Sequence, residues 1–149
     1  MEEKLQLGFE NAQIGFRNFT GAEGLYNKEG DRSFVIFMDE ARAKELEEQG
    51  WNIKWPKDQT DEEDTRQPYL PVSVGYRFFP PKVLLIADGN KTMLGEEEVG
   101  MLDWAEIQNA DIVIRPYNWT VNGNSGIKAY LKAAYITIVT DQFASKYGM

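Results

Sequence analysis

The sequence predicts a mainly β domain, folded as a compact antiparallel barrel or sandwich with one surface helix. Segments in which apolar and polar residues alternate recur along the chain, and clusters of Gly, Asn, Asp and Pro separate them. One segment alone has the charge pattern and end signals of a helix. With 149 residues, 42% of them hydrophobic, the chain is long enough for one ordinary domain with its own core, which we expect over residues 1–149.

The first strand is expected over residues 11–19, where the apolar pattern has a period of two. In this pattern Ile14 and Phe16 would share one face of the strand. Arg17 and Phe19 would lie on the opposite face. A glycine-rich loop follows, because turn-forming residues crowd the next positions.

A second strand and the helix come next. Residues 32–38 are rich in aromatic and β-branched side chains, as strands are. Asp39 is a good N-cap for a charged helix over residues 40–49, and Gly50 would end it. Residues 51–55 form a short predicted strand whose two tryptophans share one face, which indicates core packing more than a surface for stacking.

The middle of the chain combines an acidic loop with two strands. Residues 57–67 contain no apolar side chain, and we expect a mobile loop there. Strands are expected over residues 70–79 and 82–87, with a proline pair between them. The second strand could instead be one arm of a hairpin that closes near residues 88–90.

The last part of the chain carries two β segments. Residues 95–109 are ambiguous between a short helix and a loop, and residues 110–117 form a predicted strand. Residues 122–126 have the composition of a turn, and residues 126–139 form the final strand. Several strands, one helix and this chain length favour a five-stranded barrel of the OB type with additional hairpins.

The residue types that are missing exclude several kinds of site. The chain has no cysteine and no histidine, so it cannot contain a disulfide, a zinc ribbon, a His-ligated metal or a Ser-His-Asp triad. We expect no cofactor and no metal. The apolar runs are too short to cross a bilayer and the first residues do not form a signal peptide, which predicts a cytoplasmic protein without a membrane partner.

Charge is distributed unevenly along the chain. Lys and Arg number 16 and Asp and Glu number 24, and the formal charge of −8 alone argues against a nucleic-acid binder. Acids cluster within residues 39–48, 58–64 and 96–98. Residues 112–135 contain no acid, whereas cations are present there. The net charge is therefore a poor guide to any single surface.

Two neighbouring segments near the end of the chain place cations and flat rings on a shared surface. Alternation gives each strand one outward set, namely Arg115, Tyr117 and Trp119 on the first and Lys128, Tyr130 and Lys132 on the second. The same spacing of a cation and a ring recurs at Arg17 with Phe19 and at Arg77 with Phe79. Proteins that bind single strands need this combination, since bases stack on aromatic rings while cations follow the phosphates. The alternative is that these side chains only pack against neighbours or solvate a strand edge.

At the same residues the chain resembles bacteriophage single-stranded DNA-binding proteins of the OB-fold type. The resemblance is carried by residues 17–21, 26–32, 114–119 and 126–132, and the last of these segments, Gly-Ile-Lys-Ala-Tyr-Leu-Lys, is the most specific. It implies sequence-tolerant coating of exposed DNA strands during phage replication or recombination, without catalysis. Many such proteins end in an acidic tail that recruits partners. This chain stops at Ser-Lys-Tyr-Gly-Met, so recruitment through a tail is not expected.

The residues and the resemblance together give one set of candidate DNA-contacting side chains. All are cations or aromatic rings: Arg17, Phe19, Arg32, Arg77, Phe79, Arg115, Tyr117, Trp119, Lys128, Tyr130 and Lys132. The expected partners are single-stranded DNA, replication or recombination proteins and, in a homo-oligomer, further copies of the chain.

Two other functions stay open at this point. The acids, above all those within residues 58–64, could make the chain an inhibitor that engages a basic protein partner. A carboxylate metal site for phosphodiester cleavage could form from Glu96, Glu97, Glu98, Asp103 and Glu106, although nothing in the sequence brings these side chains together.

Overall fold

A computed structural model describes residues 6–24, 28–57 and 66–140 of the chain. Within these ranges it contains eight strands, one α-helix and one 3-10 helix. The strands are β1 (Leu7–Phe9), β2 (Gln13–Asn18), β3 (Arg32–Phe37), β4 (Tyr69–Val74), β5 (Lys82–Ala87), β6 (Asn90–Leu94), β7 (Ile107–Val121) and β8 (Asn124–Ile138). The helices are α1 (Glu40–Glu48) and the 3-10 helix η1 (Val99–Asp103).

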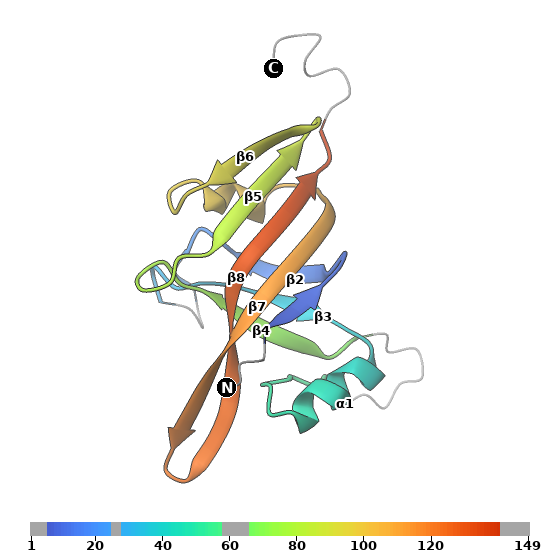
Figure 1. The fold of residues 1–149 in the computed structure, drawn as a ribbon, viewed down its shortest axis with the longest axis vertical. Coiled ribbons are helices and arrows are strands. Elements are labelled where there is room, and N and C mark those ends of the chain that lie inside the picture. Colours follow the sequence, from blue (N-terminus) through green and yellow to red (C-terminus); the bar gives the residue numbers. More distant parts are fainter. Residues whose placement is uncertain (1–5, 25–27, 58–65, 141–149) are drawn as a thin grey trace.

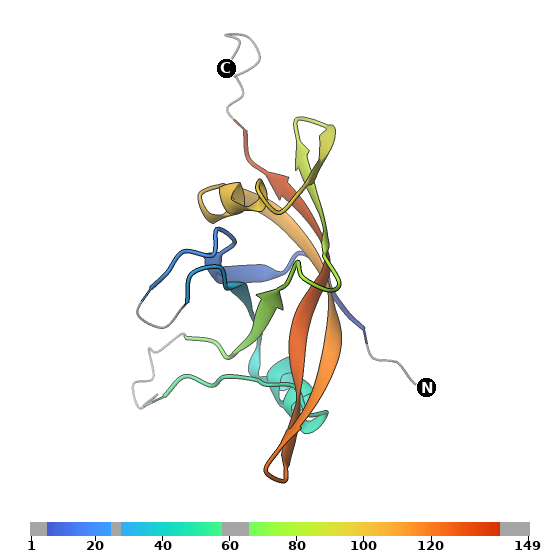
Figure 2. The ribbon, with the colours of Figure 1, turned by 90° about the vertical axis from the view of Figure 1, so that its left-hand side faces the viewer.

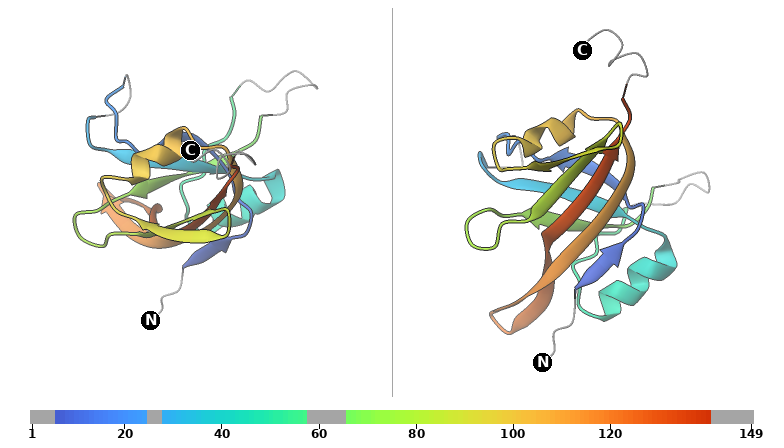
Figure 3. Two further views of the ribbon diagram at one scale, coloured as in Figure 1. Left: turned by 90° about the horizontal axis from the view of Figure 1, so that it is seen from above. Right: turned by 45° about the horizontal axis from the view of Figure 1, so that its top comes forward.

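All eight strands belong to one sheet, which curls around the core when seen from above (Figure 3). The strand order is β1-β7-β8-β4-β3-β2, and β5 joins the sheet by pairing with both β6 and β8. The long hairpin of β7 and β8 is antiparallel, whereas β4 and β5 run parallel to β8. The predicted fold class, a mainly β domain of the OB-like type, is confirmed. The structure has one open sheet of eight strands, and the hairpin of β5 and β6 is one of the additional hairpins.

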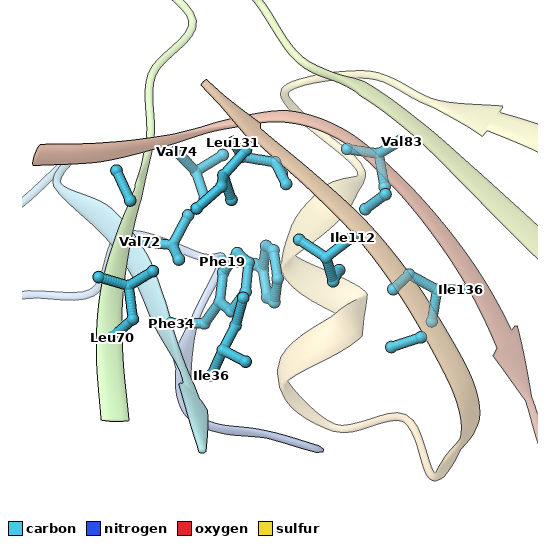
Figure 4. Close-up of a cluster of buried hydrophobic side chains, with 14 of the residues drawn as sticks. Phe19, Phe34, Ile36, Leu70, Val72, Val74, Val83, Ile112, Leu131 and Ile136 are labelled. Atoms are coloured by element: carbon cyan, nitrogen blue, oxygen red, sulfur yellow. The ribbon is translucent and has the colours of Figure 1, made fainter. Parts of the chain in front are cut away.

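The core lies between the two sides of the curled sheet (Figures 2 and 4). Every second residue of β4 is buried, at Leu70, Val72 and Val74, and the same period places the alternate residues outward. Phe19 and Phe34 stack at the centre of the core, with ring centroids 5.2 Å apart. This alternation decides which side chains can form a surface site.

The helix follows its sequence signals. The carboxylate of Asp39 accepts a hydrogen bond of 2.8 Å from the backbone N–H of Arg42, and Gly50 has a φ of +107° after the last turn. Residues 51–55 do not form a regular strand and make only two isolated bridges. The core interpretation of this segment is confirmed for Trp51 and Ile53, which are both buried.

Two tight turns shape the hairpins. Asn122 and Gly123 both have positive φ, the conformation of a two-residue hairpin turn, and they close β7 onto β8. Asp88 and Gly89 close β5 onto β6 in the same way, so the hairpin alternative for this region is confirmed. The far half of the β7–β8 hairpin projects beyond the rest of the sheet as an arm (Figures 1 and 2).

Pro116 lies where β7 becomes an edge strand. The described part of β1 pairs with β7 only as far as Ile114, and from there on β7 has β8 as its one neighbour among the described residues. Proline is tolerated at such an edge because its missing N–H faces away from the ladder. The pairing of Pro116 with Ala129 therefore leaves the hairpin intact.

A β-bulge in β2 changes the faces that simple alternation predicts. Gly15 pairs with Val35 and Asn18 with Ser33, so two residues of β2 oppose one of β3. The first bulged residue, Phe16, has a φ of +46°. The prediction that Ile14 and Phe16 share a face is therefore wrong. Ile14 packs against the core, whereas Phe16 is exposed.

Two predictions for the middle of the chain, a strand over residues 70–79 and an acidic loop, have other outcomes. The strand predicted over residues 70–79 ends at Val74, because Gly75 begins a loop that continues to the proline pair. The larger part of the predicted mobile acidic loop, residues 58–65, lies outside the described residues. Among the described residues, no helix is long and apolar enough to span a bilayer.

Candidate nucleic-acid interface

The sheet register brings one outward residue from each of four strands into a row. Ser73 of β4 pairs with Ser33 of β3 on one side and with Tyr130 of β8 on the other. Tyr130 in turn pairs with Arg115 of β7. Paired residues of neighbouring strands point to the same face, so this row crosses the outer face of the curled sheet.

Two adjoining hollows follow this row, and we call them together the outer groove. The larger has a volume of about 640 Å³ and is lined by Gly30, Asp31, Arg32, Ser33, Ser73, Val74, Gly75, Tyr76, Arg77, Glu96, Lys128 and Tyr130. The smaller has a volume of about 400 Å³ and is lined by Gly75, Arg77, Phe78, Phe79, Arg115, Tyr117 and Tyr130. The two hollows share Gly75, Arg77 and Tyr130, so they form one continuous surface.

Tyr130 is the centre of the outer groove. The guanidinium carbon of Arg115 lies 5.1 Å from its ring centroid, and the ammonium of Lys128 lies 5.2 Å from it. The ring of Tyr117 meets it edge to face at 6.0 Å. Arg115 also lies 4.9 Å from the ring of Phe79, so one guanidinium is held between two rings. These contacts fix the cations in place while their polar edges stay available for hydrogen bonds.

The loop after β4 supplies the most exposed rings of the outer groove. Phe78 is 75% exposed and Phe79 is 68% exposed. The guanidinium carbon of Arg77 lies 5.2 Å from the Phe78 ring. Large exposed aromatic side chains are costly in water, and adjacent ones mark surfaces that contact another molecule.

Arg32 is the cation at the other end of the outer groove, and it is already partnered. Its Nε donates to the backbone oxygen of Phe19 at 3.0 Å, and its Nη1 lies 3.2 Å from a carboxylate oxygen of Glu96. Its guanidinium carbon is 5.4 Å from the ring of Tyr76. Burial raises the pKa of the Tyr76 phenol, against a smaller lowering by Arg32 and with a smaller raising by Glu96. Tyr76 is therefore a neutral wall of the groove at physiological pH.

Seven of the eleven residues predicted from the sequence line the outer groove. They are Arg32, Arg77, Phe79, Arg115, Tyr117, Lys128 and Tyr130. The prediction that Arg77 and Phe79 lie on a strand is wrong, since both belong to the loop after β4. That these residues contact DNA stays a prediction.

Phe19 and Arg17 do not belong to the outer groove. Phe19 is fully buried and stacked on Phe34, so its ring cannot stack on a base and the prediction for this residue is wrong. The guanidinium of Arg17 donates to the backbone oxygens of Leu102 and Ala105, at 2.7 and 2.8 Å. Arg17 lines a separate hollow between β2 and β7, where it fastens η1 to the sheet.

Trp119 and Lys132 are each two positions along the chain from a residue of the outer groove, but neither of them lines either hollow. Trp119 sits on the projecting arm, and its ring packs over Gly126, where an added Cβ would be 2.8 Å from a ring carbon. Lys132 is the extra residue of a bulge in β8, between the pairs of Leu131 and Ala133 with β7. Their contact with DNA stays a prediction.

Sequence reasoning missed several residues of the outer groove. Phe78 stands between two predicted residues, and the proline pair that follows was a signal that this stretch is a loop. Tyr76 and the two serines of the row, Ser33 and Ser73, have no sequence signal of their own, because their role depends on how β3, β4 and β8 pair. Glu96 reaches the groove from a distant segment by its contact with Arg32.

The carboxylates proposed for a metal site are placed differently. Asp103 accepts hydrogen bonds from the backbone of Phe19 and from the backbone and hydroxyl of Thr20, at 2.6, 3.1 and 2.7 Å. Glu98 accepts from the backbone N–H of Gly95, and Glu96 pairs with Arg32. Within the described part of the chain, no three acids come together that could hold a metal ion. The structure therefore gives the nuclease hypothesis no support.

Known proteins resemble this chain in both sequence and fold. Residues 1–149 match the family model of the phage ssDNA-binding domain. No curated protein matches the sequence.

Among solved structures, the chain is similar to the single-stranded DNA-binding protein from bacteriophage Enc34, at 16% sequence identity. The structure of that protein in complex with ssDNA aligns with a TM-score of 0.55, over 93% of this chain and 89% of that one. A second structure of it aligns with a TM-score of 0.57, over 97% and 90%. A C-terminal truncation aligns with a TM-score of 0.53, over 91% and 87%. At this identity the likeness shows a common fold.

Proposed function

This chain belongs to the family of phage ssDNA-binding domains, and we propose that it binds single-stranded DNA along the outer groove with little sequence preference. The observation that carries the proposal is the cluster around Tyr130, where two cations and a second tyrosine contact one accessible ring. The solved structure of the Enc34 protein in complex with ssDNA supports it, since that protein has a similar fold.

The chemistry of the outer groove suits a strand whose bases are unpaired. Each base can stack on an aromatic ring, and such a contact contributes roughly 1–3 kcal/mol whatever the base, because every base has a π face. Arg115, Arg77 and Lys128 then lie beside the rings, where they can donate hydrogen bonds to phosphate oxygens. Stacking and phosphate contacts both ignore base identity. The interface is therefore tolerant of sequence.

We further propose that the chain coats exposed strands during phage replication or recombination and does not catalyse a reaction. The chain has no histidine and no cysteine, so it offers neither an imidazole base nor a thiol nucleophile, the two groups most often used for such chemistry. Replication or recombination proteins and further copies of the chain are the partners that such a role requires.

The test is a fluorescence anisotropy titration of a labelled oligothymidine with the wild type and with Tyr130→Ala. Loss of one stacking ring is expected to weaken binding roughly 5- to 150-fold, the equivalent of 1–3 kcal/mol. Tyr135→Ala is the matched control, because Tyr135 is a half-buried tyrosine of the same strand that lines neither hollow. Wild-type protein that binds no oligonucleotide at low salt would refute the function. Capture of a basic protein instead would favour the inhibitor hypothesis.

A further inference from the structure

Three aromatic rings form a second cluster outside the outer groove. Phe16 of β2, Phe37 of β3 and Tyr69 of β4 meet edge to face, with ring centroids 5.6 to 5.7 Å apart. Phe16 is 68% exposed, and none of the three lines either hollow. Phe37 and Tyr69 pair across the ladder on the outward face, opposite the core side chains of the same strands.

The backbone conformation that holds Phe16 outward is energetically unfavourable. A bulky residue with a φ of +46° occupies a conformation that such residues rarely adopt, and the bulge of β2 imposes it. The neighbouring Gly15 makes room for the cluster, since a Cβ there would lie 2.5 Å from the ring of Phe37. Burial in the core explains neither feature, because the ring that they position faces solvent.

The cluster lies on the same outer face as the groove, farther along β3 and β4. On β4 the outward residues are Tyr69, Pro71 and Ser73, and Ser73 lines the outer groove. On β3 their partners are Phe37, Val35 and Ser33, of which Val35 is buried. Ser73 lies four positions after Tyr69 along the extended strand, a span of about 13 Å. The two strands are direct neighbours over this whole span.

A cation stands beside the cluster as well. Lys54 and Tyr69 exchange both backbone hydrogen bonds, at 2.8 and 2.9 Å, so their side chains point to the same face. Lys54 is exposed. Rings with an adjacent cation repeat the composition of the outer groove.

We propose that Phe16, Phe37 and Tyr69 are a second base-stacking platform for the DNA strand that occupies the outer groove, with Lys54 as a phosphate contact. The proposal rests on the proposed function. The strand leaves the groove at Ser73 and runs along β4 to the platform. The occupant is the same strand because Tyr69, Pro71 and Ser73 follow one another on the outward face of β4, all partly exposed, and lead from the platform to the outer groove.

The experiment is a length series of oligothymidines, from about 4 to 16 nucleotides, titrated against wild type and Phe16→Asn. Asparagine removes the ring and tolerates a positive φ. We expect wild-type affinity to rise in two steps as the oligonucleotide lengthens. In Phe16→Asn the first step is retained and the second is lost, with roughly 5- to 150-fold weaker binding of the longest oligonucleotide. Trp104→Asn is the matched control, since Trp104 is 86% exposed and lines neither hollow.

A second variant guards against a folding defect in β2. Lys54→Glu changes an exposed side chain outside the regular strands and is expected to weaken binding of long oligonucleotides only. If wild type, Phe16→Asn and Lys54→Glu bind each oligonucleotide length with the same affinity, the platform is overturned. The outer groove would remain as proposed. A variant that loses self-association but keeps its DNA affinity would overturn it too, by assigning the cluster to a second copy of the chain. Failure of wild type to bind any length would instead refute the proposed function.

Discussion

Arg32 and Arg115 illustrate two ways in which a single cation can be held in the outer groove. Arg115 is flanked by rings, which position it without neutralising its charge. Arg32 is paired with the carboxylate of Glu96, which offsets part of its charge. A phosphate that approaches Arg32 must compete with Glu96 for the same guanidinium edge. The two arginines should therefore contribute unequally to DNA affinity.

Removal of the competing carboxylate should strengthen binding. In Glu96→Gln we expect affinity for an oligothymidine to increase about two- to fivefold, because an exposed ion pair of this kind is worth about 0–1 kcal/mol. The dependence of log K on log salt should steepen by about 0.7, as one more phosphate is neutralised. Anisotropy titrations at several salt concentrations measure both quantities. Glu97→Gln is the control, since Glu97 is an exposed neighbour outside the groove, and equal curves for all three proteins would contradict the expectation.

At the scale of elements, alternation predicted the outward residues correctly wherever a strand runs without interruption. From Arg115 to Tyr117 and from Lys128 to Tyr130 the ladder is regular, so the outward residues could be assigned from sequence. The bulge at Phe16 could not, because it arises from pairing with β3 and leaves no period in the sequence. The same holds for the end of β4 at Val74, which depends on where its neighbours stop pairing.

The contact between η1 and the residues that follow β2, here called the joint, can be tested by mutation. The carboxylate of Asp103, the last residue of η1, accepts three hydrogen bonds from Phe19 and Thr20. In Asp103→Ala the free energy of unfolding should fall by about 2 kcal/mol, since hydrogen bonds to a charged group are among the stronger ones. Urea denaturation followed by tryptophan fluorescence measures it. Glu106→Ala, an exposed acid nearby, should stay close to wild type, and an unchanged midpoint for Asp103→Ala would show that the joint is held by other contacts.

At the scale of the whole molecule, positive and negative side chains are unevenly distributed. The formal charge is −8, yet the outer groove carries four cations, Arg32, Arg77, Arg115 and Lys128, against two acids, Asp31 and Glu96. At about 0.1 M salt the Debye length is about 10 Å, so acids beyond that distance have little effect on a strand in the groove. The net charge alone argued against a DNA-binding surface, whereas the acid-free stretch before Tyr135 contains Arg115, Tyr117, Lys128 and Tyr130 of the outer groove.

The salt dependence of binding should follow the number of cations in the outer groove and not the net charge of the chain. With three to four cations engaged, log K is expected to fall with log salt at a slope between about −2 and −3. Titrations of one oligothymidine over a tenfold range of salt measure the slope. In Arg115→Gln it should become shallower by about 0.7. Affinity that rises with salt would mean that repulsion by the acids dominates, and would argue against a cationic path for the phosphates.

Pro116 has a consequence for proteins crowded together on one DNA molecule. Copies that sit side by side hold their free strand edges at high local concentration, which is the situation in which sheets fuse into aggregates. Among the described residues, the edge of β7 beyond Ile114 has no partner strand, and Pro116 leaves it without one backbone N–H, which disfavours pairing with a neighbour's strand there.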